Sequence, residues 1–350
     1  MNKIAIFVDN LNVGGIQKSI INMLNNIDYK KYEVDLYMFN SETFYTIPNE
    51  VNIIKLKKPL KLLQFIPFEL AKAIYKPKIL DKEYNVSIDF DSYQMHTAIG
   101  ALKCNSNKKA IWIHNDIPIK LKEEIKYKIL YLFFHKKYKY FDIYNAVSEG
   151  AMESFKTLIK YNDKEYNVIP NYIDTFEIKE KLKDNIDIEI DNKKFNIVTV
   201  GRLCHQKGID IMLENFKELT KYRIDFHLYI IGDGPDREKL NKLCCDYNLE
   251  NYVTFLGNQK NPFKYLKQMD LFYLSSRYEG QGMVILEALA VGLDVLIPKH
   301  LEKYCPYVKG YNDPLKYLKN YKKGNDKKFN YLKEYNNEIT KKLNKLFDCF

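Results

Sequence analysis

Short apolar runs alternate with amphipathic stretches along the first 170 residues of the chain. Residues 3–8 have the pattern of a buried strand, and apolar positions then recur at helical spacing from 16 to 27. The same criteria predict further strands at 32–39, 51–56, 85–90, 109–114 and 143–147. They predict further helices at about 62–75, 92–104, 120–138 and 149–160. This alternation is typical of βαβ units, which build a largely parallel sheet covered by helices.

A second alternation of the same kind starts at Phe195. It predicts strands at 196–200, 227–231, 253–256, 271–275 and 295–298, and helices at 209–219, 261–269 and 282–291. Between the two halves, residues 171–194 are rich in Asp, Asn, Lys and Glu and lack an apolar stripe, which indicates a linker. The last 50 residues predict one or two basic helices rich in Tyr.

These patterns predict an α/β protein of two doubly wound domains. We expect a first domain at 1–170, a linker at 171–194, a second domain at 195–325 and a C-terminal helix at 326–350. A return of this last helix to the first domain is an open alternative. Ligands of doubly wound sheets bind at the carboxyl ends of strands, so the expected site is a cleft that the two domains face.

The composition of the chain argues against several classes of function. No uninterrupted apolar run approaches the roughly 18 residues that span a bilayer. The six cysteines show no C-x-x-C spacing and follow no signal-like segment, so we expect reduced thiols in a cytoplasmic protein. A net charge of +10 makes nucleic acid the first partner to consider. However, no nucleic-acid-binding motif is present and only four of the 55 basic residues are Arg, so an anionic ligand or membrane surface fits better.

The sharpest local feature is the run from Ser275 to Ala288, Ser-Ser-Arg-Tyr-Glu-Gly-Gln-Gly-Met-Val-Ile-Leu-Glu-Ala. A predicted strand ends in a glycine-rich turn, and a helix begins near Gly282. The free amides and the dipole of a helix N-terminus attract phosphate. Glu279 lies in the turn, and Glu287 follows about two helical turns later in an apolar helix. Alone, this pair of glutamates is typical of surface acids; the glycines between them favour a phosphate site.

A second feature is the run from Val200 to Gly208, Val-Gly-Arg-Leu-Cys-His-Gln-Lys-Gly. Arg202 lies just past the carboxyl end of a predicted strand, and Lys207 lies at the entrance to the next helix. Two cations at this position can neutralise a diphosphate without a metal and stabilise the charge that builds on a leaving group. The alternative is an ordinary solvated loop with charged side chains.

Together, these features resemble the C-terminal half of the retaining glycosyltransferases of family four, the group 1 glycosyltransferases. Four segments occur in the family's order over about 195–298, namely Gly201-Arg202-x4-Lys207-Gly208, Ile230-Ile231-Gly232-Asp233-Gly234-Pro235, Val253-Thr254-Phe255-Leu256-Gly257 and Glu279-Gly280-x6-Glu287-Ala288. The family has the GT-B architecture of two Rossmann-like domains. The resemblance implies that Arg202 and Lys207 hold the donor diphosphate, that Glu287 meets the ribose and that Glu279 lies against the transferred sugar.

The first half matches the family more loosely. The pair Gly14-Gly15 is similar to the family's glycine loop, which faces the donor phosphates and the acceptor, and no G-x-G-x-x-G of a nicotinamide fold is present. His114 closes a predicted strand, where the family places a histidine close to the reacting centre of the sugar. A lone histidine is more often structural, but this position favours a catalytic role.

The predicted site therefore has two overlapping sets of residues. The catalytic residues that we predict are Glu279, His114, Arg202 and Lys207. The donor-binding residues that we predict are Gly14, Gly15, Gly201, Arg202, Lys207, Glu279, Gly280, Gln281, Gly282, Met283 and Glu287. We expect no metal, because no Asp-x-Asp motif stands in a suitable loop; Asp89-Phe90-Asp91 has this spacing but ends a strand of the first domain. We also expect no cofactor.

Two departures from the family pattern stand out. Tyr172 follows Ile-Pro-Asn at the domain junction, where the family usually has Gly. After the strand at 295–298, the chain has little of the family's glycine-rich loop, so we expect a shortened edge of the second domain.

Two lysine-rich stretches, 55–78 and 120–140, also carry many Leu, Ile and Phe residues. One interpretation is amphipathic helices with one face in the core. The other is docking on an anionic membrane surface that presents a lipid-linked acceptor. Both interpretations are open at the level of the sequence.

The predicted function is a retaining, metal-independent hexosyltransferase. We expect transfer of a hexose or N-acetylhexosamine from a nucleotide-diphosphate sugar, with UDP as the expected nucleotide, to a hydroxyl of a glycan or polyprenyl-linked acceptor in surface or capsular polysaccharide biosynthesis. The expected location is the cytoplasm, with peripheral binding to the inner face of the cell membrane, and no nucleic-acid partner is expected. A sugar-nucleotide epimerase on the same architecture and a non-catalytic partner subunit are the alternatives.

Overall fold

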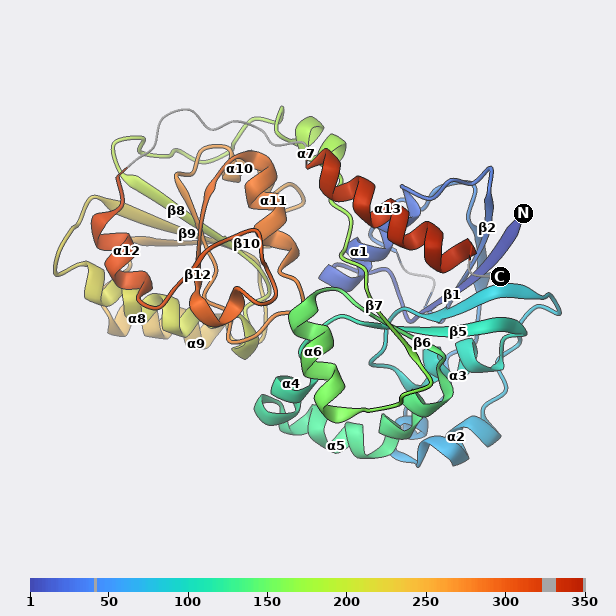
Figure 1. Ribbon diagram of the computed structural model, residues 1–350. Helices are drawn as coiled ribbons and strands as arrows, with labels where there is room; N and C mark the ends of the chain where they lie inside the picture. Colours follow the sequence, from blue (N-terminus) through green and yellow to red (C-terminus); the bar gives the residue numbers. More distant parts are fainter. Residues whose placement is uncertain (41–42, 323–331, 349–350) are drawn as a thin grey trace. The chain divides into compact units, whose positions relative to one another are not determined.

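The computed structural model describes residues 1–40, 43–322 and 332–348, which form two compact units (Figure 1). The first unit comprises the described residues of Met1–Tyr172 and Lys333–Phe350, and the second comprises those of Ile173–Leu332. Each unit has its own parallel sheet. None of the helices in the described ranges is long and apolar enough to cross a membrane.

The sheet of the first unit has seven parallel strands in the order β3-β2-β1-β4-β5-β6-β7. The strands are β1 (Asn2–Val8), β2 (Tyr32–Met38), β3 (Asn52–Lys55), β4 (Tyr84–Asp89), β5 (Ser106–Ile113), β6 (Ile143–Ala146) and β7 (Glu165–Val168). The helices are α1 (Gly15–Leu24), η1 (Lys61–Phe65), α2 (Phe68–Ile74), α3 (Met95–Lys103), α4 (Ile117–Glu123), α5 (Ile125–Phe134), η2 (His135–Tyr140), α6 (Glu149–Leu158) and α13 (Lys333–Asp348).

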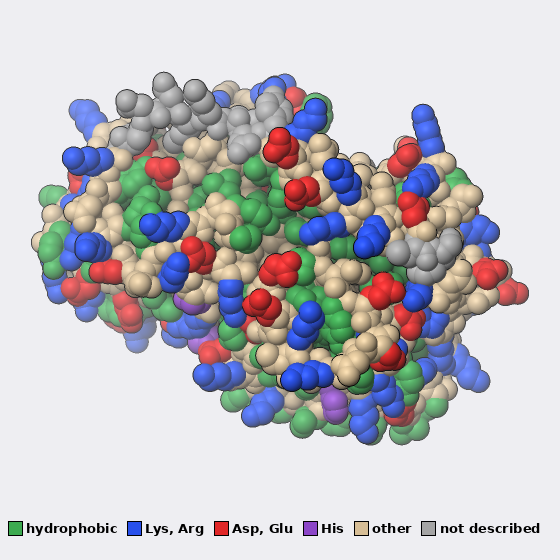
Figure 2. Space-filling view, viewed as in Figure 1, with side chains coloured by type: hydrophobic (Ala, Val, Ile, Leu, Met, Phe, Trp, Pro, Cys, Tyr) green, Lys and Arg blue, Asp and Glu red, His purple; other side chains and the backbone are tan. Residues whose placement is uncertain are grey.

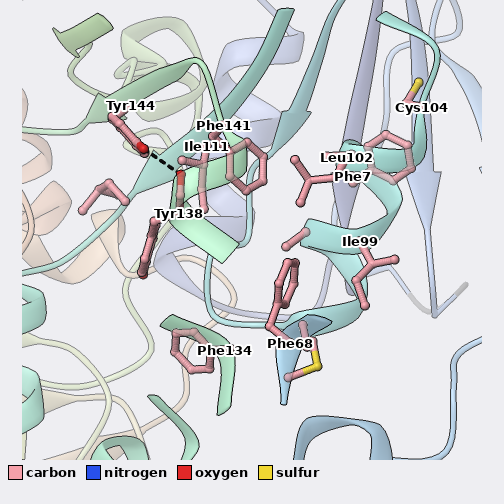
Figure 3. Close-up of a cluster of buried hydrophobic side chains, with 14 of the residues drawn as sticks. Phe7, Phe68, Ile99, Leu102, Cys104, Ile111, Phe134, Tyr138, Phe141 and Tyr144 are labelled. Atoms are coloured by element: carbon pink, nitrogen blue, oxygen red, sulfur yellow. Dashed lines mark hydrogen bonds between the residues drawn. The ribbon is translucent and has the colours of Figure 1, made fainter. Parts of the chain in front are cut away.

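The central strand β1 explains why both faces of this sheet carry helices. Successive side chains of a strand point to opposite faces. Ile4 and Ile6 belong to the hydrophobic cluster that includes α1 and α13, whereas Ala5 and Phe7 belong to the cluster beneath α2, α3, α5 and α6. Figure 3 shows the second cluster, in which the Tyr144 hydroxyl donates to the backbone oxygen of Tyr138 at 2.6 Å.

Two helices predicted in the first unit are interrupted. The helix expected at 62–75 divides into η1 and α2, because Pro67 lacks an amide hydrogen and forces the preceding Ile66 into an extended conformation. The helix expected at 120–138 divides into α4 and α5 at Glu124, whose backbone is also extended, and then tightens into η2. The spacing of apolar residues in the sequence does not reveal such breaks, because apolar residues continue to face the core on both sides of each break.

The sheet of the second unit has six parallel strands in the order β10-β9-β8-β11-β12-β13. The strands are β8 (Phe195–Val200), β9 (Phe226–Ile231), β10 (Val253–Gly257), β11 (Leu271–Tyr273), β12 (Asp294–Pro298) and β13 (Gly310–Tyr311). The helices are α7 (Thr175–Lys181), η3 (His205–Lys207), α8 (Ile209–Leu219), α9 (Arg237–Asp246), α10 (Phe263–Leu266), α11 (Met283–Val291), η4 (Lys299–Leu301) and α12 (Pro314–Asn320).

The segment 171–194, interpreted from the sequence as a linker, contains the helix α7. The side chain of Asp174 caps this helix by accepting a hydrogen bond from the Glu177 amide at 2.8 Å, and Ile178 is buried. A seven-residue helix with one buried apolar residue has no apolar stripe, so no pattern visible in the sequence predicts it.

The edge of the second unit is short but contains both a strand and a helix. After β12 the chain forms η4, then the two-residue strand β13 and the helix α12, whose Leu318 is fully buried. Residue Gly310 of β13 approaches the chain closely, because a Cβ there would lie 2.7 Å from the Cα of Lys299. The edge expected to be shortened therefore keeps one strand and one helix.

The helix α13 belongs to the first unit. Its contacts account for a tyrosine at position 172, where the family usually has Gly. The Tyr172 side chain is buried, and its hydroxyl lies 2.7 Å from the Thr340 hydroxyl of α13. The Tyr335 hydroxyl donates to the backbone oxygen of Asn171 at 2.8 Å. The parts of the predicted C-terminal helix at 326–331 and 349–350 lie outside the described residues.

Candidate active site

The candidate site of the second unit lies at the carboxyl edge of its sheet. Strands β8 and β11 are neighbours in the sheet although two strands separate them in the sequence. Such a reversal of strand order leaves a crevice beyond the carboxyl ends of the two strands, where doubly wound folds bind ligands. The loop after β8 spans residues 201–208, and the loop after β11 spans residues 274–282. These two loops hold all the site residues that the sequence predicted in this half except Met283 and Glu287, which lie on α11.

A buried ion pair joins the two loops. The Lys207 Nζ lies 2.6 Å from the Glu279 Oε1, and the side chains are 17% and 7% exposed. The Ser276 hydroxyl donates to the same oxygen at 2.6 Å. Within the described ranges, Oε2 of Glu279 accepts no hydrogen bond. The pair therefore holds an ammonium group in place at the end of β8 and leaves one carboxylate oxygen available to a ligand.

Further contacts fix the relative position of the two loops. The Arg277 guanidinium binds the Asp210 carboxylate with two hydrogen bonds, of 2.9 and 2.7 Å, and donates a third to the backbone oxygen of His205 at 2.8 Å. The Gln206 side-chain amide donates to the backbone oxygen of Tyr278 at 3.1 Å. Bidentate pairs of this kind are strong and geometrically specific, so the two loops are preorganised.

Glycines let the loops approach one another. Gly208 has a φ of +61°, and a Cβ at this position would lie 2.3 Å from the backbone oxygen of Ser275. A Cβ at Gly234 would lie 2.3 Å from the backbone oxygen of Leu203. The alkyl chain of Lys207 passes over Gly201, where a Cβ would be 3.4 Å from the Lys207 Cε.

The N-terminus of α11 is open at the same edge. Gly282 precedes this nine-residue helix in the left-handed conformation (φ +68°), and no side chain caps it. The preceding Gln281 is buried, and its backbone oxygen accepts a hydrogen bond from the Cys305 thiol at 2.7 Å. Burial, together with the charge of Glu279, raises the pKa of the Cys305 thiol well above its usual value. The thiol therefore stays protonated and supports the turn.

Arg202 and Glu287 occupy different surroundings from the ion pair. Arg202 is exposed, and its guanidinium has no hydrogen-bond or ion-pair partner within the described ranges. Glu287 is partly buried on α11. The structure thus brings Lys207 and Glu279 together and leaves Arg202 beside them without a partner in the same loop.

The predicted residues of the first unit lie at the carboxyl edge of the other sheet. His114 follows β5, and its Nε2 donates to the backbone oxygen of Phe90 at 2.6 Å. Burial lowers the pKa of His114 to about 4, so the ring is neutral near pH 7 and Nδ1 is left as an acceptor.

The glycine loop of the first unit is open at Gly15, whereas a Cβ on Gly14 would lie 2.3 Å from the Oε1 of the Gln17 side chain. Gly14 and Gly15 precede and begin α1, which has no side-chain cap. A Cβ on Gly15 would meet nothing within 4 Å. The backbone of Gly14 is extended, so neither position requires glycine for its own conformation.

Sequence inspection missed a charged cluster at this edge. Asp9, directly after β1, binds His96 Nε2 at 2.8 Å and Lys58 Nζ at 2.6 Å, and its amide donates to Asp91 Oδ2 at 3.0 Å. Burial acts to raise the pKa of Asp9, but the bonds from His96 and Lys58 outweigh it and the pKa is lowered. Burial raises the pKa of Asp91 to about 7. The signal that could have found them is a carboxylate just after each of two buried strands.

Three further contacts of the second unit were also missed. Ser276 binds Glu279, and the His300 ring lies 3.0 Å (Nε2 to oxygen) from the backbone oxygen of Ser276. The scarcity of Arg in the chain was the available signal for Arg277, but nothing in the sequence marked its partner Asp210.

Comparison with known proteins adds an independent line of evidence. Residues 180–313 match the family model of glycosyl transferases group 1. The chain is 31% identical over 195 residues to a glycosyltransferase of Methanocaldococcus jannaschii, covering 55% of this chain and 48% of that protein. It is 25% identical over 305 residues to the N-acetylgalactosamine-N,N'-diacetylbacillosaminyl-diphospho-undecaprenol 4-alpha-N-acetylgalactosaminyltransferase of Campylobacter jejuni, covering 86% and 81% of the two chains.

Among solved structures, the chain is similar to S. aureus TarM in complex with fondaparinux, alpha-GlcNAc-glycerol and UDP. The TM-score is 0.69 at 15% sequence identity, over 99% of this chain and 100% of that one. A likeness at this identity concerns the fold, and it agrees with the two parallel sheets described above in giving the GT-B architecture. Residues 180–313 of this chain thus match the group 1 glycosyltransferases, and the chain as a whole has the GT-B fold.

Proposed function

We propose that the chain transfers a hexose or N-acetylhexosamine from a UDP-sugar to a hydroxyl of a glycan or lipid-linked acceptor, with retention of configuration and without a metal. The main observation that supports this proposal is the buried ion pair of Lys207 and Glu279. It lies at the carboxyl ends of β8 and β11, beside the uncapped N-terminus of α11. A fixed cation and free helix amides are the groups that stabilise a departing diphosphate.

We assign the donor diphosphate to Lys207, Arg202 and the amides of Gly280–Met283. Arg202 has no partner in the described ranges, so it can turn to a phosphate without breaking an ion pair. The free Oε2 of Glu279 then accepts hydrogen bonds from the transferred sugar, and Glu287 meets the ribose. In this arrangement Glu279 orients both the sugar and the ammonium of Lys207, since one oxygen serves each.

We assign the acceptor side to the first unit. Its sheet edge carries Asp9, Asp91 and His96, and hydroxyl groups are suitable ligands for carboxylates and imidazole. A neutral His114 can accept a hydrogen bond from a sugar hydroxyl through Nδ1 but cannot donate one from that atom.

The names of the relatives support this assignment without deciding the substrates. The C. jejuni relative acts on a sugar carried by diphospho-undecaprenol, and the TarM structure contains UDP. We therefore propose UDP as the nucleotide, a polyprenyl-linked or glycan acceptor of surface or capsular polysaccharide synthesis, and a location at the inner face of the cell membrane.

The test is a thermal-shift screen of the purified chain against UDP-, GDP- and ADP-sugars, followed by product analysis with and without glycan acceptors. We expect stabilisation by UDP-sugars, and weaker stabilisation for Glu279→Ala and Arg202→Ala. Glu214→Ala, an exposed acid on α8, and Lys239→Ala, an exposed base on α9, are the matched controls.

Three outcomes separate the alternatives. A chain that no sugar nucleotide stabilises acts as a non-catalytic partner at most. Interconversion of the sugar nucleotide in the absence of acceptor indicates an epimerase. Transfer with inversion at the anomeric carbon, measured by NMR of the product, contradicts the proposed retention.

A further inference from the structure

One surface of the first unit is apolar where water-facing helices are normally polar. On α5, Ile125, Ile129 and Leu132 are 76%, 49% and 67% exposed. Their spacing of four and three residues places them on one side of the helix. On η1, α2 and the turn before them, the exposed apolar side chains are Leu60, Leu62, Phe65, Leu70 and Ile74. We call the exposed apolar residues of these elements the docking face.

The elements that carry the docking face lie side by side. The rings of Phe65 and Phe133 meet edge to face with centroids 6.3 Å apart, which joins η1 to α5. The Lys139 ammonium of η2 lies 2.8 Å from the Glu69 carboxylate of α2. The exposed apolar residues therefore lie on adjacent elements of one unit.

The fold does not need this surface, because the opposite sides of the same helices already fill the core. Tyr127 and Phe134 of α5 and Phe68 and Ala71 of α2 are buried in the cluster of Figure 3. An amphipathic helix with its apolar side in the core is expected to be polar on the other side. An apolar outer side in addition to an apolar inner side marks a surface for an apolar partner.

Lysines accompany the docking face. Between residues 57 and 80 there are six Lys and one acid, and between 117 and 140 there are seven Lys and two acids. Among these, Lys61, Lys76, Lys122, Lys126 and Lys128 are exposed. In Figure 2, green and blue side chains alternate along the edge of the first unit where Figure 1 draws α4, α5 and α2.

A basic pocket of about 370 Å³ lies at the end of this surface. Lys136 of η2, which directly follows α5, lines it together with His135, Lys160 and Lys139, the lysine that pairs with Glu69. A pocket with several cations suits a phosphate group, and the neighbouring leucines and isoleucines suit acyl chains.

We propose that the docking face binds the surface of an anionic phospholipid bilayer, with Ile125, Ile129, Leu132 and Leu62 in the acyl boundary and a lipid phosphate in the basic pocket. This inference deepens the membrane location proposed above and rests on it for its biological purpose. Nucleic acid would use the lysines but not the exposed leucines, and a protein partner would not require the excess of positive charge.

The experiment is sedimentation of the full chain with vesicles of phosphatidylcholine alone or mixed with phosphatidylglycerol, at low and high salt. We expect binding to the anionic vesicles, weakened by salt. The double variant Ile125→Ser/Leu132→Ser and the double variant Lys122→Glu/Lys126→Glu should each bind about tenfold more weakly. The matched controls in the second unit are Ile224→Ser, whose side chain is 67% exposed, and Lys239→Glu/Lys242→Glu on α9.

Two results overturn the proposal. One is the absence of binding to anionic vesicles at low salt; the other is an equal loss of binding in the controls and the docking-face variants. Melting temperature and UDP-sugar binding are measured on every variant, without vesicles. Retained sugar binding with lost vesicle binding separates a failure of docking from a failure of the transferase assignment. Retention of an anionic protein or of RNA, with no vesicle binding, assigns the surface to that partner instead.

Discussion

The two units share one strand order but differ in the chemistry at its centre. In each, the first and fourth strands are neighbours, β1 with β4 and β8 with β11. After β8 and β11 the chain places Lys207, Glu279 and the open end of α11. After β1 and β4 it places Asp9 and Asp91, with His96 and Lys58 around them.

This difference supports the assignment of ligands that we propose for the two units. A diphosphate needs cations and free amides, and its charge is repelled by buried carboxylates. At its strand-order reversal the second unit has one buried carboxylate, Glu279, which Lys207 neutralises beside the uncapped N-terminus of α11. The first unit gathers two carboxylates, Asp9 and Asp91, at the equivalent place. The topology thus supplies the position of a site, and the loop residues decide which ligand the site accepts.

The strongest test of this contrast removes the central ammonium of each edge. We expect Lys207→Met to lower kcat/KM by about 10²–10³, the usual effect of losing a group that stabilises a leaving anion. It also leaves Glu279 buried without its cation, which should destabilise the chain by about 3 kcal/mol. Lys58→Met, whose lysine is half-exposed beside Asp9, should affect donor binding little.

A second substitution separates the two effects of Lys207→Met. Adding Glu279→Gln removes the unpaired carboxylate, so the melting temperature should recover while kcat/KM stays low. Recovery of the rate together with the melting temperature would mean that Lys207 acts only on stability.

The glycines give a second contrast between the units. Gly208→Ala forces a side chain into a left-handed backbone and against the oxygen of Ser275, so we expect a loss of about 1–3 kcal/mol of unfolding free energy. Gly15→Ala meets open space at the start of α1 and should change stability by less than about 1 kcal/mol. Chemical denaturation measures both. An equal loss for the two variants would contradict the geometry described here.

The predictable part of this molecule is the part with a local pattern. Buried strands such as 3–8 and 196–200 are visible because apolar residues cluster there, and Glu279 and Lys207 are visible because glycines and strand ends flank them. The segment at α7 was missed because its seven-residue helix has no apolar stripe. The break at Glu124 was missed because the inward apolar side continues through it.

Contacts between residues that are far apart in the sequence could not be predicted from any local pattern. The sequence predicted both Lys207 and Glu279 but not the bond between them, which joins residues 72 positions apart. A carboxylate after each of two buried strands was visible, Asp91 within Asp89-Phe90-Asp91, but the contacts that join Asp9 to Asp91 and His96 were not. Whether His114, Gly14 and Gly15 serve the donor stays a prediction.

The buried acid of the first unit predicts a stability that depends on pH. The pKa of Asp91 is raised by burial to about 7, whereas an unfolded Asp titrates near 3.8. Between these values the folded chain holds a proton that the unfolded chain has lost, so this residue's contribution to stability declines as pH rises from about 4 to 7. Asp91→Asn should therefore gain stability relative to the parent over this range. A stability difference that is constant from pH 4 to 8, measured by urea denaturation, would show that Asp91 is ionised throughout.

The smallest effect concerns one histidine in each unit. Burial lowers the pKa of both His114 and His227 to about 4, from 6.5. The pH dependence of stability is opposite to that caused by Asp91. Between pH 6.5 and 4 the unfolded chain binds a proton that the folded chain does not bind, so stability falls as pH falls. NMR titration of the Cε1 protons of the two histidines should give midpoints near pH 4 in both units. The variants His114→Gln and His227→Gln should each make the unfolding free energy less dependent on pH below about 6.5. A midpoint near 6.5 for His114 alone would mean that water reaches its ring at the sheet edge of the first unit, and Nδ1 would then be protonated in part of the molecules near neutral pH.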